Sequence, residues 1–158
     1  MGPRPALAKG LCLSLSLWLT ISSFAVFPNG LSYFNEWIGG PKYGWKYLAD
    51  SNVDWGQNMR QAGEFVERHR GAQITLFVFS SDLWTRHVRL EDVSLGPWPE
   101  GVVAPGVRYR PRPGYYVVSI NLLTGLLYPR EHQDFLAEFR GMQPYARAGY
   151  SINIYRVE

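Results

Sequence analysis

The sequence predicts an α/β fold: a small, mainly parallel or mixed sheet of about four strands, flanked by helices and preceded by one N-terminal transmembrane helix. Three observations lead to this prediction. The chain has 158 residues, of which 46% are hydrophobic, enough for one core. An uncharged apolar segment lies near the N-terminus, and strand-like and helix-like patterns alternate along the rest.

The apolar segment covers residues 10–28, which contain no charged side chain. As a helix these residues reach ~28 Å, close to the ~30 Å of a hydrocarbon core. Arg4 and Lys9 precede the segment, so the positive-inside rule places residues 1–9 in the cytoplasm and residues 29–158 outside it. Cleavage after Ala25 is the alternative, since small residues occupy the positions that signal peptidase requires. The chain would then be secreted.

Aromatic residues are concentrated in residues 33–55, with seven in 23 positions. Three interpretations stay open: core packing, a membrane interface, and stacking against a ligand such as a sugar. We expect about half of them in the core. A first short strand is predicted over residues 43–49.

A helix is predicted over residues 55–69. Asp54 and Gln57 have the spacing of a capping box at its start, and Gly71 suits its end. Its apolar face is formed by Trp55, Met59, Ala62, Phe65 and Val66.

Four further elements complete the predicted fold. Residues 74–80 form a continuous apolar run, typical of a strand covered on both faces. Ser81 and Asp82 are expected to cap a short helix that runs to Val88. Strands are predicted over residues 115–121 and 150–157, with a helix over 131–140 between them.

Residues 95–114 are rich in proline and glycine and are predicted to form a loop. Either the loop contains a hairpin near residues 107–110 or it is a surface lid. Arg108, Arg110 and Arg112 alternate around Tyr109. They form either a solvated face, which we favour, or a contact with anionic lipid headgroups or a phosphate.

Polar side chains follow the predicted strands at their carboxyl ends, where open α/β sheets bind ligands. The candidate ligand-binding residues are Asp50, Ser51, Asn52, Asp54, Trp55, Gln57, Ser119 and Asn121. Asp50 and Asp54 could act as a carboxylate pair in acid–base chemistry or hold a hard cation. We prefer the simpler interpretation, in which Asp54 caps the helix and Asp50 pairs with an arginine.

Several function classes find no support in the sequence. The chain has one cysteine and scattered histidines, so neither a disulfide framework nor a metal site is indicated. No nucleotide-binding or hydrolase motif occurs, and no cofactor is expected. Only Arg4 and Lys9, among 16 basic residues, and none of the 13 acidic residues precede residue 28. The rest of the chain is therefore almost neutral, which argues against a nucleic-acid partner.

Two blocks of sequence carry a family resemblance. They are PNGLSYFNEWIGGP at residues 28–41 and YLADSNVDWGQ at residues 47–57. They resemble the C-terminal part of bacterial polyprenyl-phosphate-dependent glycosyltransferases of the GT-C superfamily, which are related to protein O-mannosyltransferases. Residues 118–125 and 149–155 look similar as well. The resemblance implies a last transmembrane helix followed by a small extracytoplasmic domain, and it favours an anchor over a cleaved signal.

The chain also departs from that family. The enzymes carry catalytic acidic residues in an outer loop after the first of many spans, whereas here no Asp or Glu precedes Glu36. No catalytic residue can therefore be carried over. We expect a membrane-anchored domain derived from a lipid-linked-sugar glycosyltransferase, non-catalytic alone, that is accessory to glycosyl transfer or a fragment of a truncated enzyme.

The expected partners are the membrane, a glycan or a polyprenyl-phosphate sugar, and a multi-span glycosyltransferase body. Two alternatives to an accessory role stay open. The chain could be a subunit that completes a glycosyltransferase in trans, or a secreted carbohydrate-binding module. A purely structural role for the DSN-x-DWGQ block is a further hypothesis.

Overall fold

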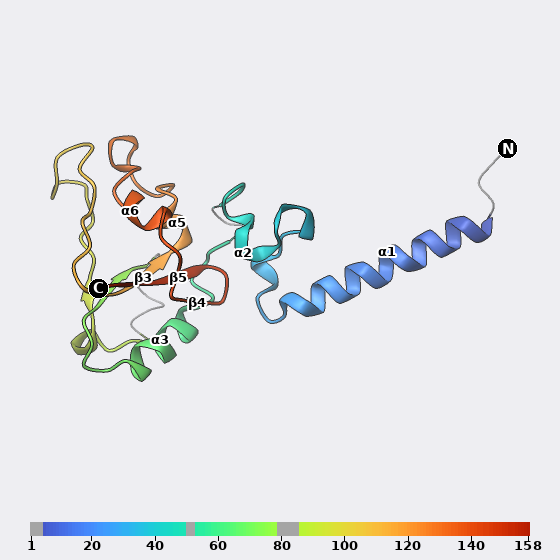
Figure 1. Ribbon diagram of the computed structural model, residues 1–158, viewed down its shortest axis with the longest axis horizontal. Helices are drawn as coiled ribbons and strands as arrows, with labels where there is room; N and C mark the ends of the chain where they lie inside the picture. Colours follow the sequence, from blue (N-terminus) through green and yellow to red (C-terminus); the bar gives the residue numbers. More distant parts are fainter. Residues whose placement is uncertain (1–4, 50–52, 79–85) are drawn as a thin grey trace.

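The computed structural model describes residues 5–49, 53–78 and 86–158. A long helix, α1 (Pro5–Val26), projects from a domain in which a mixed sheet lies between helices (Figure 1). The predicted α/β class is confirmed. The sheet has five strands, one more than expected.

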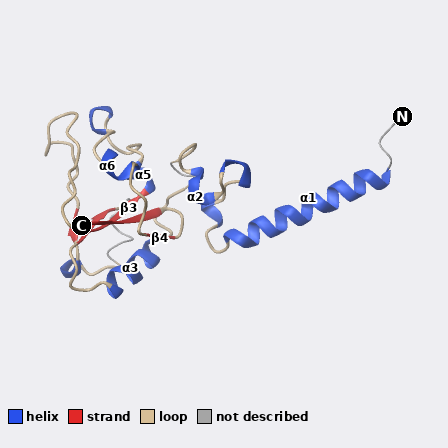
Figure 2. Cartoon of the chain, viewed as in Figure 1, coloured by secondary structure: helices blue, strands red, loops and turns tan. Residues whose placement is uncertain are grey.

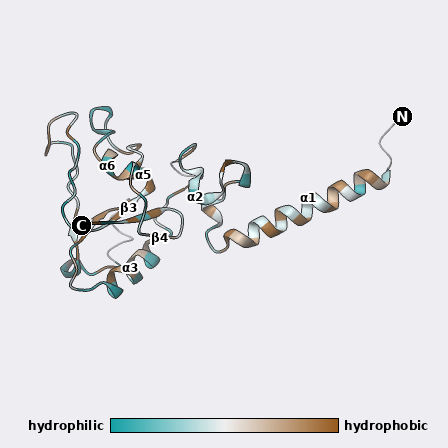
Figure 3. Ribbon diagram, viewed as in Figure 1, coloured by the Kyte–Doolittle hydropathy of each residue, from teal (hydrophilic) through white to brown (hydrophobic). Residues whose placement is uncertain are grey.

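Helix α1 is the one described helix that is long and apolar enough to cross a membrane. Its leucines, isoleucine and aromatic side chains are exposed, and Ser22 and Val26 are its two buried residues. Figure 3 shows white to brown colouring along most of its length. A signal sequence near an N-terminus meets the same criteria of length and composition.

Short helical turns follow α1: η1 (Gly30–Ser32), η2 (Glu36–Ile38) and α2 (Pro41–Gly44). The strand predicted over residues 43–49 is wrong. Pro41 occupies the first turn of α2, a position that suits proline, and backbone hydrogen bonds within residues 40–48 continue the helical turns. The alternating aromatic residues here do not follow the pleat of a sheet.

Helix α3 (Met59–Arg68) covers one face of the sheet. It begins four residues later than predicted because Gly56, with a φ of 78°, is left-handed and stands outside any right-handed helix. Met59, Ala62, Phe65 and Val66 are buried as expected. Trp55 is 57% exposed, so its assignment to the buried helix face is wrong.

The strands are β1 (Ile74–Phe77), β2 (Ser94–Leu95), β3 (Gly114–Ser119), β4 (Ala146–Ala148) and β5 (Ile152–Val157), in the spatial order β2-β1-β3-β5-β4. Strand β1 pairs in parallel with β2 and β3, and β5 pairs antiparallel with β3 and β4. The sheet is therefore mixed. The strand predicted over residues 115–121 ends at Ser119 because α5 (Ile120–Leu123) begins there.

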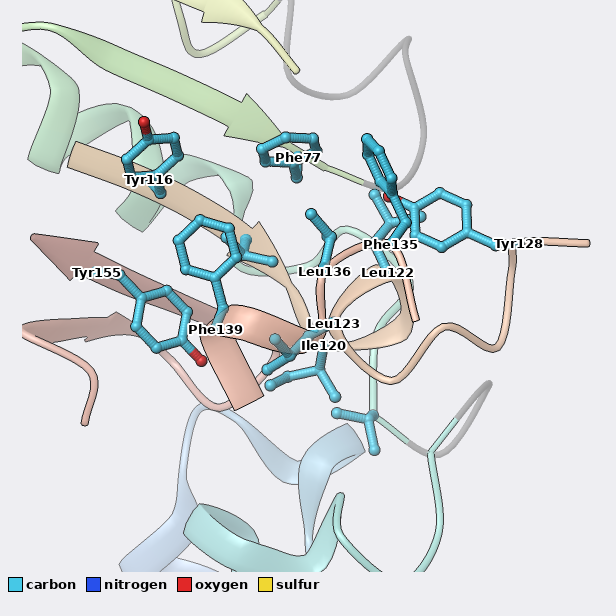
Figure 4. Packing of buried hydrophobic residues seen from close by; sticks show 12 residues of the cluster. Phe77, Tyr116, Ile120, Leu122, Leu123, Tyr128, Phe135, Leu136, Phe139 and Tyr155 are labelled. Carbon is cyan, nitrogen blue, oxygen red and sulfur yellow. The ribbon is translucent and has the colours of Figure 1, made fainter. Parts of the chain in front are cut away.

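Both faces of the sheet are buried, since side chains alternate along each central strand. On β3, Tyr116 and Val118 belong to one core cluster and Val117 to the other. The first cluster combines aromatic rings from β1, β3, β5 and α6 (Ala137–Arg140) with aliphatic side chains from α5 (Figure 4). The second lies beneath α3.

The helix predicted over residues 131–140 is split into η5 (Arg130–His132) and α6. Arg140 explains the break. Its guanidinium donates to the backbone carbonyls of Gln133, Leu123 and Thr124, so the Gln133 carbonyl is turned away from a continuous helix. Asp134 accepts a further bond from the same group at 2.7 Å.

Replacing Arg140 by lysine removes the planar fork that joins these carbonyls. We expect Arg140→Lys to lower the free energy of unfolding by about 1–2 kcal/mol. Chemical denaturation measures the loss, and Arg130→Lys at an exposed position is the matched control. Equal stability of the two variants would contradict this account of the break.

Residues 96–113 form a long loop with neither regular strand nor helix (Figure 2). Of the two alternatives for this stretch, the hairpin near residues 107–110 is therefore wrong. The loop is held by the backbone bond from Tyr109 N to Phe135 O at 2.7 Å. The Tyr116 hydroxyl also bonds to both the N–H and the carbonyl of Arg112. Most of the helix predicted from Ser81 to Val88 lies outside the described residues.

Candidate functional site

Asp54 lies at the carboxyl end of β3 and is 2% exposed. Its Oδ2 accepts a hydrogen bond from Ser119 Oγ, and its Oδ1 accepts one from Gly56 N at 2.8 Å. Asn121 Nδ2 donates to the Asp54 backbone carbonyl at 3.2 Å. The structure therefore brings together three of the predicted site residues. Ser119 lies 65 positions after Asp54 in the sequence, and Asn121 lies 67 positions after it.

Burial raises the pKa of the Asp54 carboxyl, and hydrogen bonds from Ser119, Gly56 and Ser151 oppose that effect in part. A raised pKa at the end of a strand is one mark of a functional site. Here the carboxyl is enclosed and both oxygens already accept hydrogen bonds. This geometry fits a carboxyl that holds a turn in place better than one that contacts a substrate.

The predicted capping pair does not cap a helix. Asp54 accepts from Gly56 N within a turn, and Gln57 Oε1 accepts from Trp55 N at 2.7 Å. Gln57 Nε2 donates to Val53 O at 2.8 Å and to Ser32 Oγ at 3.3 Å. The block DWGQ therefore folds as a turn that is hydrogen-bonded to itself and to the segment after α1.

Asn58 extends this polar network. Its Nδ2 donates to Asn29 Oδ1 at 2.6 Å, and its Oδ1 accepts from Ser151 Oγ at 2.9 Å. Gly149 lies against the Asn58 amide with a φ of 55°, and a Cβ there would collide with it. The network thus joins three parts of the chain: the segment after α1, the start of α3 and the β4–β5 turn.

Sequence reasoning missed four members of the network: Asn29, Ser32, Asn58 and Ser151. Their partners lie 21 to 93 residues away, which no local pattern reveals. The predicted residues Asp50, Ser51 and Asn52 lie outside the described part of the chain. Their interpretations, including the Asp50–Asp54 carboxylate pair, remain predictions.

Arg108, Arg110 and Arg112 are exposed on the loop of residues 96–113, at the end of the domain opposite α1 (Figure 1). Their alternation has a packing cause. Tyr109 turns inward, with its ring 5.0 Å from that of Phe77, so its neighbours face solvent. Contact between these arginines and the membrane that α1 would cross is not supported by this placement.

An open groove of about 510 Å³ lies on the domain surface. It is lined by Trp45–Ala49, Thr124–Leu126 and Gln133. Two aromatic rings, one lysine and two neutral polar side chains are the kinds of residue that hold an uncharged polar ligand. Among the described residues, no group of three His, Cys, Asp or Glu side chains could hold a metal ion.

Comparisons with protein-family models, with curated protein sequences and with solved structures give no match for this chain.

Proposed function

We propose that this chain is a membrane-anchored extracytoplasmic domain that is accessory to sugar transfer from a polyprenyl-phosphate donor and does no chemistry itself. The observation that carries the proposal is the enclosure of Asp54 at the strand end where a catalytic carboxylate would be sought. A multi-span body, in the same polypeptide or another, would supply the catalytic acidic residues. The sequence resemblance to GT-C enzymes and the exposed apolar α1 support the same assignment.

The groove lined by Trp45–Ala49 and Gln133 is the proposed contact with the glycan. Tyr47 is 71% exposed there, and an aromatic ring of this kind packs against the apolar face of a sugar ring. Gln133 and Thr124 also line the groove, and their amide and hydroxyl groups can bond to sugar hydroxyls.

Binding of the intact chain in nanodiscs to a panel of polyprenyl-phosphate hexoses tests the proposed role. Tyr47→Ala is expected to weaken binding at least tenfold and leave the melting temperature within about 2 °C, because the side chain is exposed. Tyr145→Ala, at an exposed tyrosine outside the groove, is the matched control. Equal binding by the two variants would remove the groove from the proposal, and sugar transfer by the purified chain would show that it is catalytic.

Mass spectrometry of the chain recovered from cells tests the anchor. We expect an uncleaved α1 in the membrane fraction after alkaline extraction. A product that begins at Val26 and is found outside the membrane would instead establish the secreted alternative.

Deletion of the gene distinguishes the accessory role from completion of an enzyme in trans. Completion in trans predicts that a cellular sugar transfer is abolished, whereas an accessory role predicts that the transfer continues.

A further inference from the structure

Large apolar side chains remain exposed beside the C-terminal end of α1. We call residues 27–48 the collar. Trp37 is 85% exposed and Phe27 is 78% exposed, values unusual for an aromatic side chain on a water-facing surface. The other exposed large apolar residues of the collar are Leu31, Tyr33, Tyr43, Tyr47 and Leu48.

The collar folds back against α1 and is continuous with it (Figure 1). Ser22 and Val26 are buried, and Trp18 Nε1 donates to Glu36 Oε2 at 3.2 Å. The Phe34 ring lies so close to Gly44 that no Cβ could fit there. The exposed aromatic residues therefore belong to a folded segment that contacts α1.

The chemistry of the collar matches the lipid headgroup region. Tyrosine and tryptophan concentrate at membrane–water interfaces because their rings pack on apolar chains and their polar atoms meet water. Lys42 and Lys46 place their Nζ atoms 5.4 Å and 5.2 Å from the Tyr43 ring, so positive charge accompanies the aromatic surface. Anionic headgroups attract lysines in such positions.

We propose that the collar lies in the headgroup region of the leaflet from which α1 emerges, with lipid as its partner. The proposal rests on the membrane anchor in the proposed function and not on sugar transfer. It assigns the exposed aromatic residues at 27–48 to the interface interpretation.

Glu36 sets the depth of the collar. Hydrogen bonds, first from Ser22 and also from Trp18, lower the pKa of its carboxyl and favour the charged form. The hydrogen bond from Trp18 Nε1 at 3.2 Å holds this carboxylate beside α1. A carboxylate is costly in hydrocarbon, so the outer hydrocarbon boundary crosses α1 between Trp18 and Ser22 and not at Pro28. The helix from Lys9 to Ser22 then spans ~20 Å, which requires Lys9 to extend toward the inner surface and the bilayer to thin locally.

Single-cysteine variants in a Cys12→Ser background test both statements. An environment-sensitive fluorophore is attached at Trp37→Cys, Tyr47→Cys, Ile21→Cys, Leu13→Cys or Val102→Cys in phosphatidylcholine–phosphatidylglycerol vesicles. We expect nitroxides near the headgroup to quench labels at 37, 47 and 21, and deep nitroxides to quench the label at 13. The label at 102, on the far loop, should be several-fold more accessible to iodide than those at 37 and 47.

Accessibility to iodide at 37 and 47 equal to that at 102 would overturn the lipid contact, and would leave a protein partner as the occupant. Quenching at 21 as deep as at 13 would overturn the assigned boundary. Neither result would affect sugar binding by the groove, so this inference and the proposed function can fail separately.

The unmodified chain provides a second test that does not depend on labelled variants. Its lysines are Lys9, Lys42 and Lys46. Acylation by a water-soluble reagent should be slower at Lys42 and Lys46 in vesicles with phosphatidylglycerol than in vesicles without it. Equal rates in the two kinds of vesicle would contradict headgroup contact.

Discussion

Asp54→Ala should lower the free energy of unfolding by about 2–4 kcal/mol, which corresponds to a fall in melting temperature on the order of 10 °C. The substitution removes the acceptors of Ser119 Oγ and Gly56 N and leaves both donors buried without them. A loss of this size identifies the carboxyl as part of the fold. A cap on an exposed helix would cost only ~1 kcal/mol.

Asp54→Asn keeps the size of the side chain and removes its ionisation, so it isolates the effect of the charge on stability. Burial raises the pKa of Asp54 in the folded chain above its unfolded value, so folding favours the protonated carboxyl. This contribution is complete below the unfolded pKa of ~3.9 and is lost as the pH rises through the folded pKa. The asparagine does not titrate. The stability of the wild type relative to Asp54→Asn should therefore decrease as the pH is raised from ~4 toward neutrality.

Denaturant melts of wild type, Asp54→Ala and Asp54→Asn across this pH range measure both effects. Glu100→Ala, at an exposed position, is the control and should change stability by less than about 0.5 kcal/mol. Full stability of Asp54→Ala together with loss of hexose binding would reverse the interpretation and make Asp54 a ligand-contacting residue.

Elements that bury apolar side chains were predictable from sequence because burial leaves a direct pattern: a continuous apolar run for a strand covered on both faces, and helical spacing for a helix with one buried face. The apolar run at β1 and the spacing of Met59, Ala62 and Phe65 on α3 are such patterns. Strand β4 was missed since it has three residues with Arg147 at its centre, and its place comes from pairing with β5. The strand predicted at residues 43–49 is the opposite error. Aromatic residues at alternating positions there resemble a strand pattern, although the backbone forms helical turns.

The candidate site was predictable only where topology determined it. Ser119 and Asn121 do lie near Asp54, and they follow the carboxyl end of β3 as predicted. The strand over residues 43–49 that was expected to bring Asp54 there does not form, so that part of the reasoning was wrong. The enclosure of Asp54 could not be predicted, since it results from packing between distant segments. The contact of Asn29 with Asn58 could not be predicted either, because it results from how the segment after α1 packs on the domain.

Asn58→Ala should loosen the connection between α1 and the domain. Asn58 is 2% exposed and joins Asn29 to Ser151 through one amide group. Its removal leaves buried polar atoms unpaired, so we expect a loss of about 2–3 kcal/mol in stability. Because the Asn29 contact is lost as well, chymotryptic cleavage in the collar, at Tyr33 or Trp37, should become several-fold faster in nanodiscs.

Gln61→Ala is the matched control for this effect. Gln61 Oε1 accepts from the same Asn58 amide at 2.5 Å, but its removal keeps the contacts with Asn29 and Ser151. The control should therefore leave cleavage in the collar unchanged. If Asn58→Ala and Gln61→Ala were cleaved at the same rate, the amide network would stabilise the domain alone. If only Asn58→Ala were cleaved faster, the position of the domain relative to α1 would depend on this buried amide, even though Gln57 Nε2 also donates to Ser32 Oγ in the segment following α1.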